Sequence, residues 1–328
     1  MSYQTTASIE TLQEMLNHIE RGPEIYRPSK FWTEFQAKNI EQIRLSGLQN
    51  FKRTVNQNYF NWMVVTPDNN QFKAAMRTFE SYPHADAFKV LLETSPELEG
   101  FFEANPLKER EGHEIYRIYL GLLMNFATQS TPNGLGQVLT ERLLGNPIKA
   151  WLHGRPISQD LANSLRERNT ICQPFEVGFA DNRKIKFVEI GAGYGRLVDM
   201  MMRSAPCQCV IVDVAPALYV SQWYLSTIYG SQKQIFRFRP WASFDSIAEQ
   251  LLAADLAFLT PDQFAALPDE YFDAAAAISN LAEMTAAQAS NYISLLTHKV
   301  RTAVYIKQWI TSTNGFDGHT FQRADFAL

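Results

Sequence analysis

The chain has 328 residues, which is too long for one average domain and long enough for two domains that each bury a core. Hydrophobic residues make up 46% and charged residues 20% of the sequence, a composition typical of folded globular proteins. The formal net charge is −4, and no stripe dense in lysine and arginine accompanies it. Since nucleic-acid binding depends on neutralising phosphates, this charge argues against a nucleic-acid partner.

The first twenty residues lack a basic start followed by an apolar core, so they do not resemble a secretion signal. No window approaches eighteen consecutive apolar residues, and we therefore expect a cytoplasmic protein without a membrane partner. The three cysteines, Cys172, Cys207 and Cys209, do not have the spacing of a four-ligand metal site. We expect them to be reduced.

From residue 5 to about 145, apolar residues recur at helical spacing between proline-containing turns, which predicts an α-helical N-terminal domain over residues 1–145. Ser29 is a candidate N-cap for the second helix. The expected helices span residues 7–20, 29–47, 71–80, 85–93, 109–128 and 134–144.

After residue 146 the pattern changes, because short apolar runs alternate with helical segments, as in a parallel sheet with helices on both faces. This predicts a second domain over residues 146–328. The carboxyl ends of its strands should meet at one edge, where open α/β sheets bind ligands. The expected strands are 185–190, 210–214, 235–239, 256–259, 274–279 and 303–307. The expected helices are 158–171, 196–205, 216–229, 243–252, 262–267 and 285–297.

The first expected strand leads into three closely spaced glycines, Gly191, Gly193 and Gly195, directly before a helix. Glycine tolerates the backbone angles of so tight a turn and lets a ligand lie against the main chain. Asp213 ends the second strand 22 positions after Gly191, where a carboxylate can accept hydrogen bonds from both ribose hydroxyls of a nucleoside. A turn that serves packing alone is the other interpretation.

The third glycine discriminates between two classes of nucleoside-binding enzyme. Nicotinamide enzymes use G-x-G-x-x-G, whose last position is Arg196 here. The observed G-x-G-x-G, which includes Ala192 and follows the acidic Glu189, resembles the loop of class I methyltransferases. This resemblance implies S-adenosylmethionine as cofactor and S-adenosylhomocysteine as product, with a nicotinamide-dependent oxidoreductase as the disfavoured alternative.

Further segments resemble the same class of enzyme. In class I methyltransferases an Asp after the third strand commonly faces the adenine amine, which makes Asp262 or Gln263 a candidate adenine contact. The alternative is that Asp262 caps the helix after Pro261. Val214, beside Asp213, and Asn280, after the fourth strand, complete the candidate cofactor residues.

The chain as a whole resembles the bacterial sugar O-methyltransferase family, in which an α-helical region precedes a Rossmann-like class I methyltransferase sheet. The segments that carry the resemblance lie between residues 31 and 309: 31–32, 50–62, 157–164, 189–197, 212–220, 280–284 and 305–309. The resemblance implies methylation of a hydroxyl, or an amine, of a sugar or another polar metabolite. Two departures stand out: Asn280 replaces an expected serine, and only nineteen residues follow Trp309, so the terminal antiparallel hairpin is either missing or cut short.

Methyl transfer to a hydroxyl needs one base, which we expect near the carboxyl ends of the strands. Glu283 is the main candidate, and its alternative role is to satisfy backbone donors at a helix start. His153 and His319 lie in predicted loops and are further candidates. Candidate substrate contacts are Tyr59, Asn61 and Trp62, which could equally form an interdomain core, and Asp160.

No cluster of His, Asp and Glu has the spacing of metal ligands, so we expect metal-independent transfer. The expected partner is a small-molecule substrate, and a homodimer is one open possibility for the assembly. A binding module that keeps the cofactor pocket without catalysis is the second functional hypothesis, because the sequence shows no unmistakable base.

Overall fold

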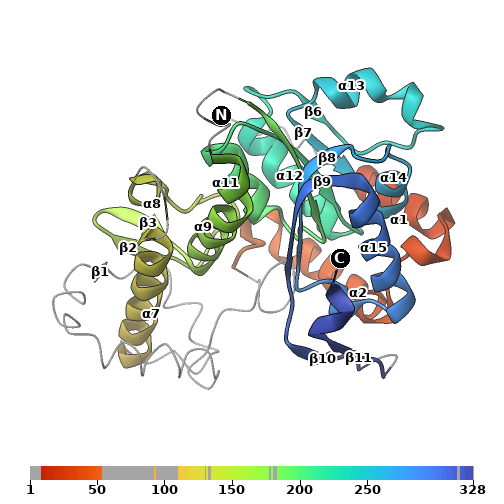
Figure 1. Cartoon of the computed structure of the whole chain (residues 1–328). Helices are drawn as coiled ribbons and strands as arrows, with labels where there is room; N and C mark the ends of the chain where they lie inside the picture. The colour runs from red at the N-terminus through yellow and green to blue at the C-terminus, as the bar shows by residue number, and fades with distance from the viewer. Residues whose placement is uncertain are drawn as a thin grey trace. The chain divides into compact units, whose positions relative to one another are not determined.

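The computed structural model describes residues 9–53, 92–93, 110–129, 131, 134–176, 179, 183–315 and 318–327 (Figure 1). It divides into two compact units, of which one joins residues 1–41 to residues 170–328 and the other comprises residues 42–169. The boundary expected near residue 146 falls inside the second unit. Within the described residues, no helix is long and apolar enough to cross a membrane.

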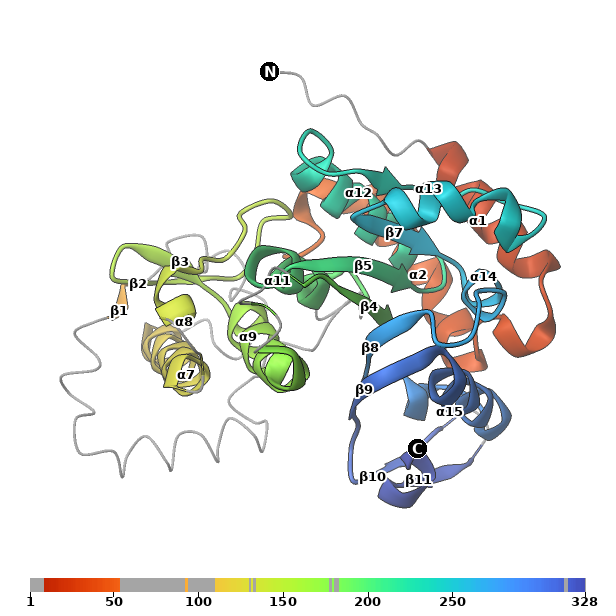
Figure 2. The same ribbon diagram turned by 45° about the horizontal axis from the view of Figure 1, so that its top comes forward.

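The first unit is built on a parallel sheet with the strand order β6-β7-β5-β4-β8-β9 (Figure 2). Ile190 at the end of β4 pairs with Val212 of β5 and Ala277 of β8, so these strands end at the same level. The strands are β4 (Ile185–Ile190), β5 (Cys207–Val212), β6 (Ile235–Phe236), β7 (Leu256–Leu259), β8 (Phe272–Ile278) and β9 (Val300–Lys307).

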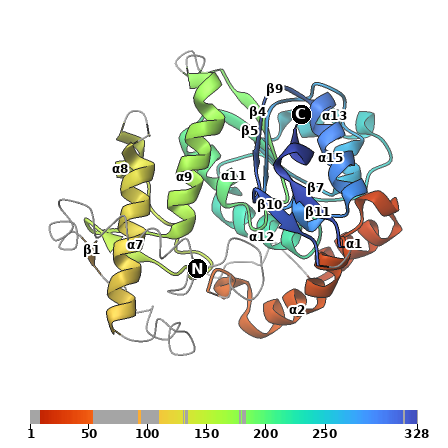
Figure 3. The same cartoon turned by 60° about the horizontal axis from the view of Figure 1, so that its bottom comes forward.

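Helices cover both faces of this sheet, as expected for the Rossmann-like fold (Figure 3). One face packs on α13, α14 and α15 through a cluster that includes Val188, Leu251, Phe264 and Leu296. The opposite face carries α11 and α12, and eleven residues of α12 are buried. The helices are α11 (Arg196–Ser204), α12 (Ala217–Tyr229), α13 (Ala248–Ala253), α14 (Pro261–Ala265) and α15 (Ala286–Lys299).

The sequence predicts every strand of the sheet, and the differences lie at the ends. β5 begins at Cys207, three residues earlier than expected, and β6 is only two residues long. The helix expected over 243–252 is interrupted, because Ile247 has φ −128° between a short 3-10 helix (Phe244–Ser246) and α13.

The N-terminal helices α1 (Ile9–Arg21) and α2 (Lys30–Ser46) form as predicted. Leu12, Met15 and Ile19 are the buried residues of α1, with the spacing of one helix face, and α1 packs against α12. Residues 1–41 therefore belong to the unit that contains the sheet.

The second unit contains α7 (Arg110–Gln129), α8 (Leu135–Val138) and a small sheet of β1 (Leu92–Glu93), β2 (Ala150–Leu152) and β3 (Arg155–Ile157). The helix predicted over 134–144 ends at Val138, because Leu139 is extended and Glu141 donates its N–H to Pro156. Glu141 also binds Lys52 at 2.6 Å in a buried ion pair. The helix predicted over 71–80 lies outside the described residues, and the end of the one predicted over 85–93 is strand β1. Helix α9 (Gln159–Cys172) follows β3.

A C-terminal hairpin is present, but it is separate from the main sheet. Strands β10 (Thr311–Thr313) and β11 (Thr320–Gln322) pair only with each other, and a 3-10 helix (Arg323–Phe326) follows. The rings of Phe321 and Phe326 stack at 5.5 Å and are buried in the core cluster on the α15 face. The hairpin therefore caps this core without extending the sheet.

Candidate active site

The glycine turn begins directly at the carboxyl end of β4. Gly191, Gly193 and Gly195 have φ angles of +64°, +59° and +85°, all in the left-handed region that disfavours other residues. Gly191 donates its N–H to Val212 at 2.8 Å, and Gly195 donates to the buried Ala192 at 3.0 Å. The turn is thus hydrogen-bonded to β5, and α11 begins directly after it.

Packing also requires the first and third of these glycines. A Cβ on Gly191 would lie 2.5 Å from Nδ2 of Asn280, and a Cβ on Gly195 would lie 2.8 Å from Leu225 and 2.9 Å from Ile211. These two glycines therefore lie against other protein groups, as the packing interpretation requires. Gly193 differs, because its N–H points to the residue that ends the neighbouring strand.

Asp213 accepts that hydrogen bond. Its Oδ2 accepts from the N–H of Gly193 at 2.8 Å, and its Oδ1 accepts from the N–H of Val214 at 2.7 Å. Burial raises the pKa of Asp213 to about 7, although both backbone hydrogen bonds act to lower it. The residue is partly exposed, and because a carboxylate oxygen can accept two hydrogen bonds, each oxygen has capacity for a further donor.

Asn280 links three strand ends beneath the turn. Its Nδ2 donates to the carbonyl of Ile190, and its Oδ1 accepts from Gln308 at 3.3 Å. Gln308 in turn donates to Ala277 at 3.4 Å. The buried amide thus supports the floor of the glycine turn, and its predicted contact with the cofactor stays a prediction. Glu189 is buried in β4.

The end of β7 shows how the two adenine candidates differ. Both ends of the Gln263 amide are hydrogen-bonded within the protein, since its Oε1 accepts from Thr260 at 3.1 Å and its Nε2 donates to Arg239 at 2.8 Å. Asp262 instead accepts at Oδ1 from the Thr260 hydroxyl at 2.7 Å and at Oδ2 from His18 at 2.9 Å. Thr260 is the N-cap of α14 and forms a capping box with Gln263, so the interpretation of Asp262 as the cap of this helix is wrong.

The pKa of Asp262 reflects these partners. Burial acts to raise it, but the hydrogen bonds from His18 and Thr260 together with the charge of His18 outweigh burial and hold the pKa below its ordinary value. The carboxylate therefore stays ionised and presents only acceptor atoms.

Glu283 lies at the end of the short 3-10 helix that follows β8 (Leu281–Glu283). Burial raises the pKa of its carboxyl to about 8; a hydrogen bond from the Trp32 side chain opposes this rise, and the nearby Asp213 adds to it. Thr285, rather than Glu283, caps α15, because its hydroxyl accepts from Gln288 at 3.2 Å. Glu283 is therefore not used as the helix-start carboxylate.

Residues 1–41 contribute side chains that the sequence interpretation did not assign to the site. Ser29 donates its hydroxyl to the carbonyl of Glu283 at 2.7 Å, and Gln36 donates to Ala215 at 3.2 Å. With Trp32 and His18, these contacts join α1 and α2 to the carboxyl ends of β5, β7 and β8. The sequence held one hint, since residues 31–32 belong to the segments that carry the family resemblance.

Several further predicted residues lie on other elements, and their part in the site stays a prediction. His153 and Asp160 belong to the second unit, where His153 is exposed in the β2–β3 turn with φ +50°. His319 is exposed beside β11, with its ring 4.5 Å from that of Phe321. The predicted substrate contacts Tyr59, Asn61 and Trp62 lie outside the described residues. The part of the chain that the structure describes holds no group of three potential metal ligands.

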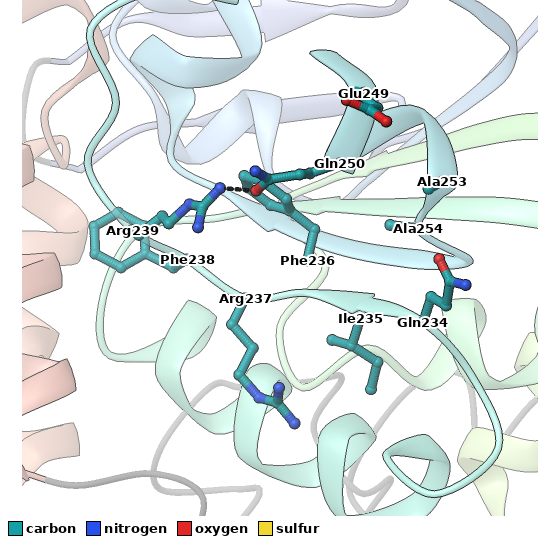
Figure 4. A pocket seen from close by; sticks show the side chains of 10 residues that line it. All are labelled: Gln234, Ile235, Phe236, Arg237, Phe238, Arg239, Glu249, Gln250, Ala253 and Ala254. Atoms are coloured by element: carbon teal, nitrogen blue, oxygen red, sulfur yellow. Dashed lines mark hydrogen bonds between the residues drawn. The ribbon is translucent and has the colours of Figure 1, made fainter. Parts of the chain in front are cut away.

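A pocket of about 620 Å³ lies elsewhere, along the edge strand β6 and helix α13 (Figure 4). Arg239 donates to Gln250 across it and lies 5.0 Å from the centre of the Phe236 ring, whereas Ile235 and Arg237 point to the other side of the strand. None of the predicted site residues lines this pocket.

No family model and no curated protein matches the sequence. Among solved structures, the chain is similar to the (4+2)-cyclase SpnF at 16% identity, with a TM-score of 0.33 over 51% of this chain and 54% of that one. It is also similar to a complex between the Haloferax volcanii Trm112 methyltransferase activator and a candidate methyltransferase, at 12% identity and a TM-score of 0.26 over 45% and 59%. The chain thus spans little more than half of each matched chain, and the fold assignment rests on the strand order itself.

Proposed function

We propose that the protein is an S-adenosylmethionine-dependent methyltransferase that methylates a hydroxyl, or an amine, of a sugar or another polar small metabolite. The observation that carries this proposal is the left-handed glycine turn after β4, whose Gly193 N–H donates to Asp213 at the end of β5. This pairing presents a bare backbone and a carboxylate at the edge where α/β sheets bind nucleosides.

The residues present fit such a cofactor. The partly exposed Asp213 has a raised pKa, and two ribose hydroxyls would supply the donors that stabilise its charged form. The charge of Asp213 adds to the raised pKa of Glu283, and a positively charged ligand such as a sulfonium would favour the ionised form of both carboxyls. Bound S-adenosylmethionine would supply the electrophilic methyl group.

Arg196 argues against a nicotinamide cofactor. It occupies the first position of α11, where the dinucleotide pattern has its third glycine for close packing of the helix on the strand. Here that position holds a buried arginine instead of a glycine.

Glu283 is the proposed general base. Its pKa of about 8 makes its ionised form a stronger base than an ordinary glutamate, and a bound sulfonium would favour that ionised form. Its place after β8, at the carboxyl edge of the sheet, suits an acceptor hydroxyl that loses its proton at or after attack on the methyl group. Trp32 and Ser29 hold the carboxyl and the backbone of this residue in position.

The test is transfer of a labelled methyl group from S-adenosylmethionine to a panel of sugars and amino sugars. Glu283→Gln should abolish turnover while S-adenosylhomocysteine still binds, and EDTA should leave turnover unchanged. Full activity of Glu283→Gln would remove the assigned base. Loss of turnover with EDTA would overturn the metal-independent mechanism.

The second candidate is a module that binds the cofactor without catalysis. Its support is that His153 and His319, the other two candidate bases, are both exposed in turns. Cofactor binding without transfer to any acceptor of the panel would favour this alternative.

A further inference from the structure

Asp262 and His18 are 244 positions apart in the sequence and meet at the carboxyl end of β7. The His18 Nε2 donates to Oδ2 of Asp262 at 2.9 Å, and the hydroxyl of Thr260 donates to Oδ1 at 2.7 Å. The backbone N–H of Asp262 also donates to this carboxylate, so three donors face two oxygens that can accept about four hydrogen bonds, and one acceptor site remains. The two partners set the direction in which a further donor must approach.

His18 is itself held in place by its surroundings. Its ring meets the ring of Phe238 edge to face at 5.5 Å, and the N–H of Phe238 donates to Gln222 of α12 at 2.7 Å. Three buried residues of α1 fix the helix on the sheet unit: Leu12, Met15 and Ile19. The imidazole is thus positioned by contacts that do not involve a ligand.

A ligand can still reach this pair. The side chains of His18 and Asp262 are 20% and 22% exposed, whereas Gln263 is buried with its amide already bonded at both ends. Asp262 is consequently the accessible polar side chain of the two adenine candidates at the end of β7.

We propose that His18 is a positioning residue, which orients the carboxylate of Asp262 to accept a hydrogen bond from the 6-amino group of the cofactor's purine. This inference rests on the proposed function and extends it to a part of the chain ahead of the methyltransferase-like sheet. An ionised carboxylate only accepts hydrogen bonds, so the pair selects a purine with an amino group over one with a carbonyl oxygen at the same position.

The test compares two neutral ligands on the full chain by calorimetry. S-adenosylhomocysteine carries the amino group, and S-inosylhomocysteine carries an oxygen in its place. The native protein should prefer the adenosyl ligand by about tenfold or more, the effect of one hydrogen bond to a charged group. His18→Ala should lose most of this preference, and His18→Gln should retain it, because the glutamine amide can place a donor near the same point.

Two further variants make the result specific. Asp262→Asn should favour the inosyl ligand, since its amide can donate to the carbonyl oxygen. His298→Ala is the matched control and should change neither affinity, because His298 is exposed and its ring bonds Ser294 of its own helix.

The ratio of the two affinities separates positioning from simple stability. If His18→Ala weakens both ligands by the same factor or leaves the ratio unchanged, the proposal is overturned while the proposed function stands. An unchanged ratio in Asp262→Asn would remove the purine contact itself. If the native protein binds neither ligand, the proposed function fails and this inference fails with it.

Discussion

The backbone N–H of Gly193 donates a hydrogen bond of 2.8 Å to Oδ2 of Asp213, which joins the glycine turn after β4 to the end of β5. The turn and the carboxylate are therefore one structural unit, although 20 residues separate them. Because Oδ1 of Asp213 is held in the same way by Val214, the carboxylate is oriented before any ligand arrives.

Replacing Asp213 with alanine should weaken S-adenosylhomocysteine binding about tenfold or more, because two acceptors for ribose hydroxyls are lost. Asp213→Asn keeps one acceptor oxygen and should have an intermediate effect. Calorimetric titration measures both. An Asp213→Ala variant that binds as tightly as the native protein would remove the ribose assignment.

Gly195→Ala should lower the free energy of unfolding by roughly 2–5 kcal/mol, through left-handed strain and overpacking together. The new methyl group would lie 2.8 Å from Leu225 and 2.9 Å from Ile211. Gly318→Ala is the matched control, because Gly318 has φ +73° and open space around its Cβ position. It should cost only about 1–2 kcal/mol in denaturant unfolding, and equal losses for the two variants would contradict the packing argument.

Glu283→Gln should stabilise the protein at high pH. The folded pKa of about 8 lies above the ordinary value, so the folded state binds more protons than the unfolded state between those two values. The contribution of Glu283 to the free energy of unfolding therefore decreases as pH rises from about 4.5 to about 8. The variant avoids the cost of ionising a buried carboxyl, and its advantage should reach a few kcal/mol at pH 9.

The comparison of denaturant unfolding at pH 5 and pH 9 checks this sign. Near pH 5 the carboxyl of Glu283 is protonated in the folded state, so the two proteins should differ little. If the stability difference between the variant and the native protein is the same at pH 5 and pH 9, the pKa of Glu283 is not raised.

Trp32→Phe should raise the pKa of Glu283 further, because it removes a hydrogen bond that favours the charged carboxylate and keeps an aromatic ring in place. A ¹³C NMR titration of labelled glutamate side chains measures the pKa, with Glu283→Gln identifying the resonance. Trp309→Phe is the control, as Trp309 is exposed and follows β9. A downward shift in Trp32→Phe would contradict the assigned role of the indole.

The inner strands of the sheet could be predicted because they are largely buried on both faces, as in β8, where every residue is buried. The helix predicted over 134–144 ends early, because Glu141 forms a backbone hydrogen bond to Pro156 and an ion pair with Lys52, and both partners are remote in sequence. The glycine turn and Asp213 could be predicted because they occur at a fixed spacing within one strand–helix–strand segment.

The contributions of α1 and α2 could not be predicted from local patterns. His18 lies on an ordinary amphipathic helix, and only the fold brings it 2.9 Å from Asp262. Trp32 and Ser29 meet Glu283 for the same reason, across more than 250 residues. Long-range pairs of this kind depend on how α1 and α2 pack on the sheet, which residue spacing alone does not encode.

The central claim is that the carboxyl edge of this sheet binds the methyl donor, and a thermal-shift experiment tests it most directly. A ligand that binds only the folded protein raises its apparent stability as the ligand concentration exceeds Kd. The account predicts a clear rise in Tm with S-adenosylhomocysteine, a smaller rise in Asp213→Ala, and no rise with NAD. A rise with NAD and none with S-adenosylhomocysteine would contradict it.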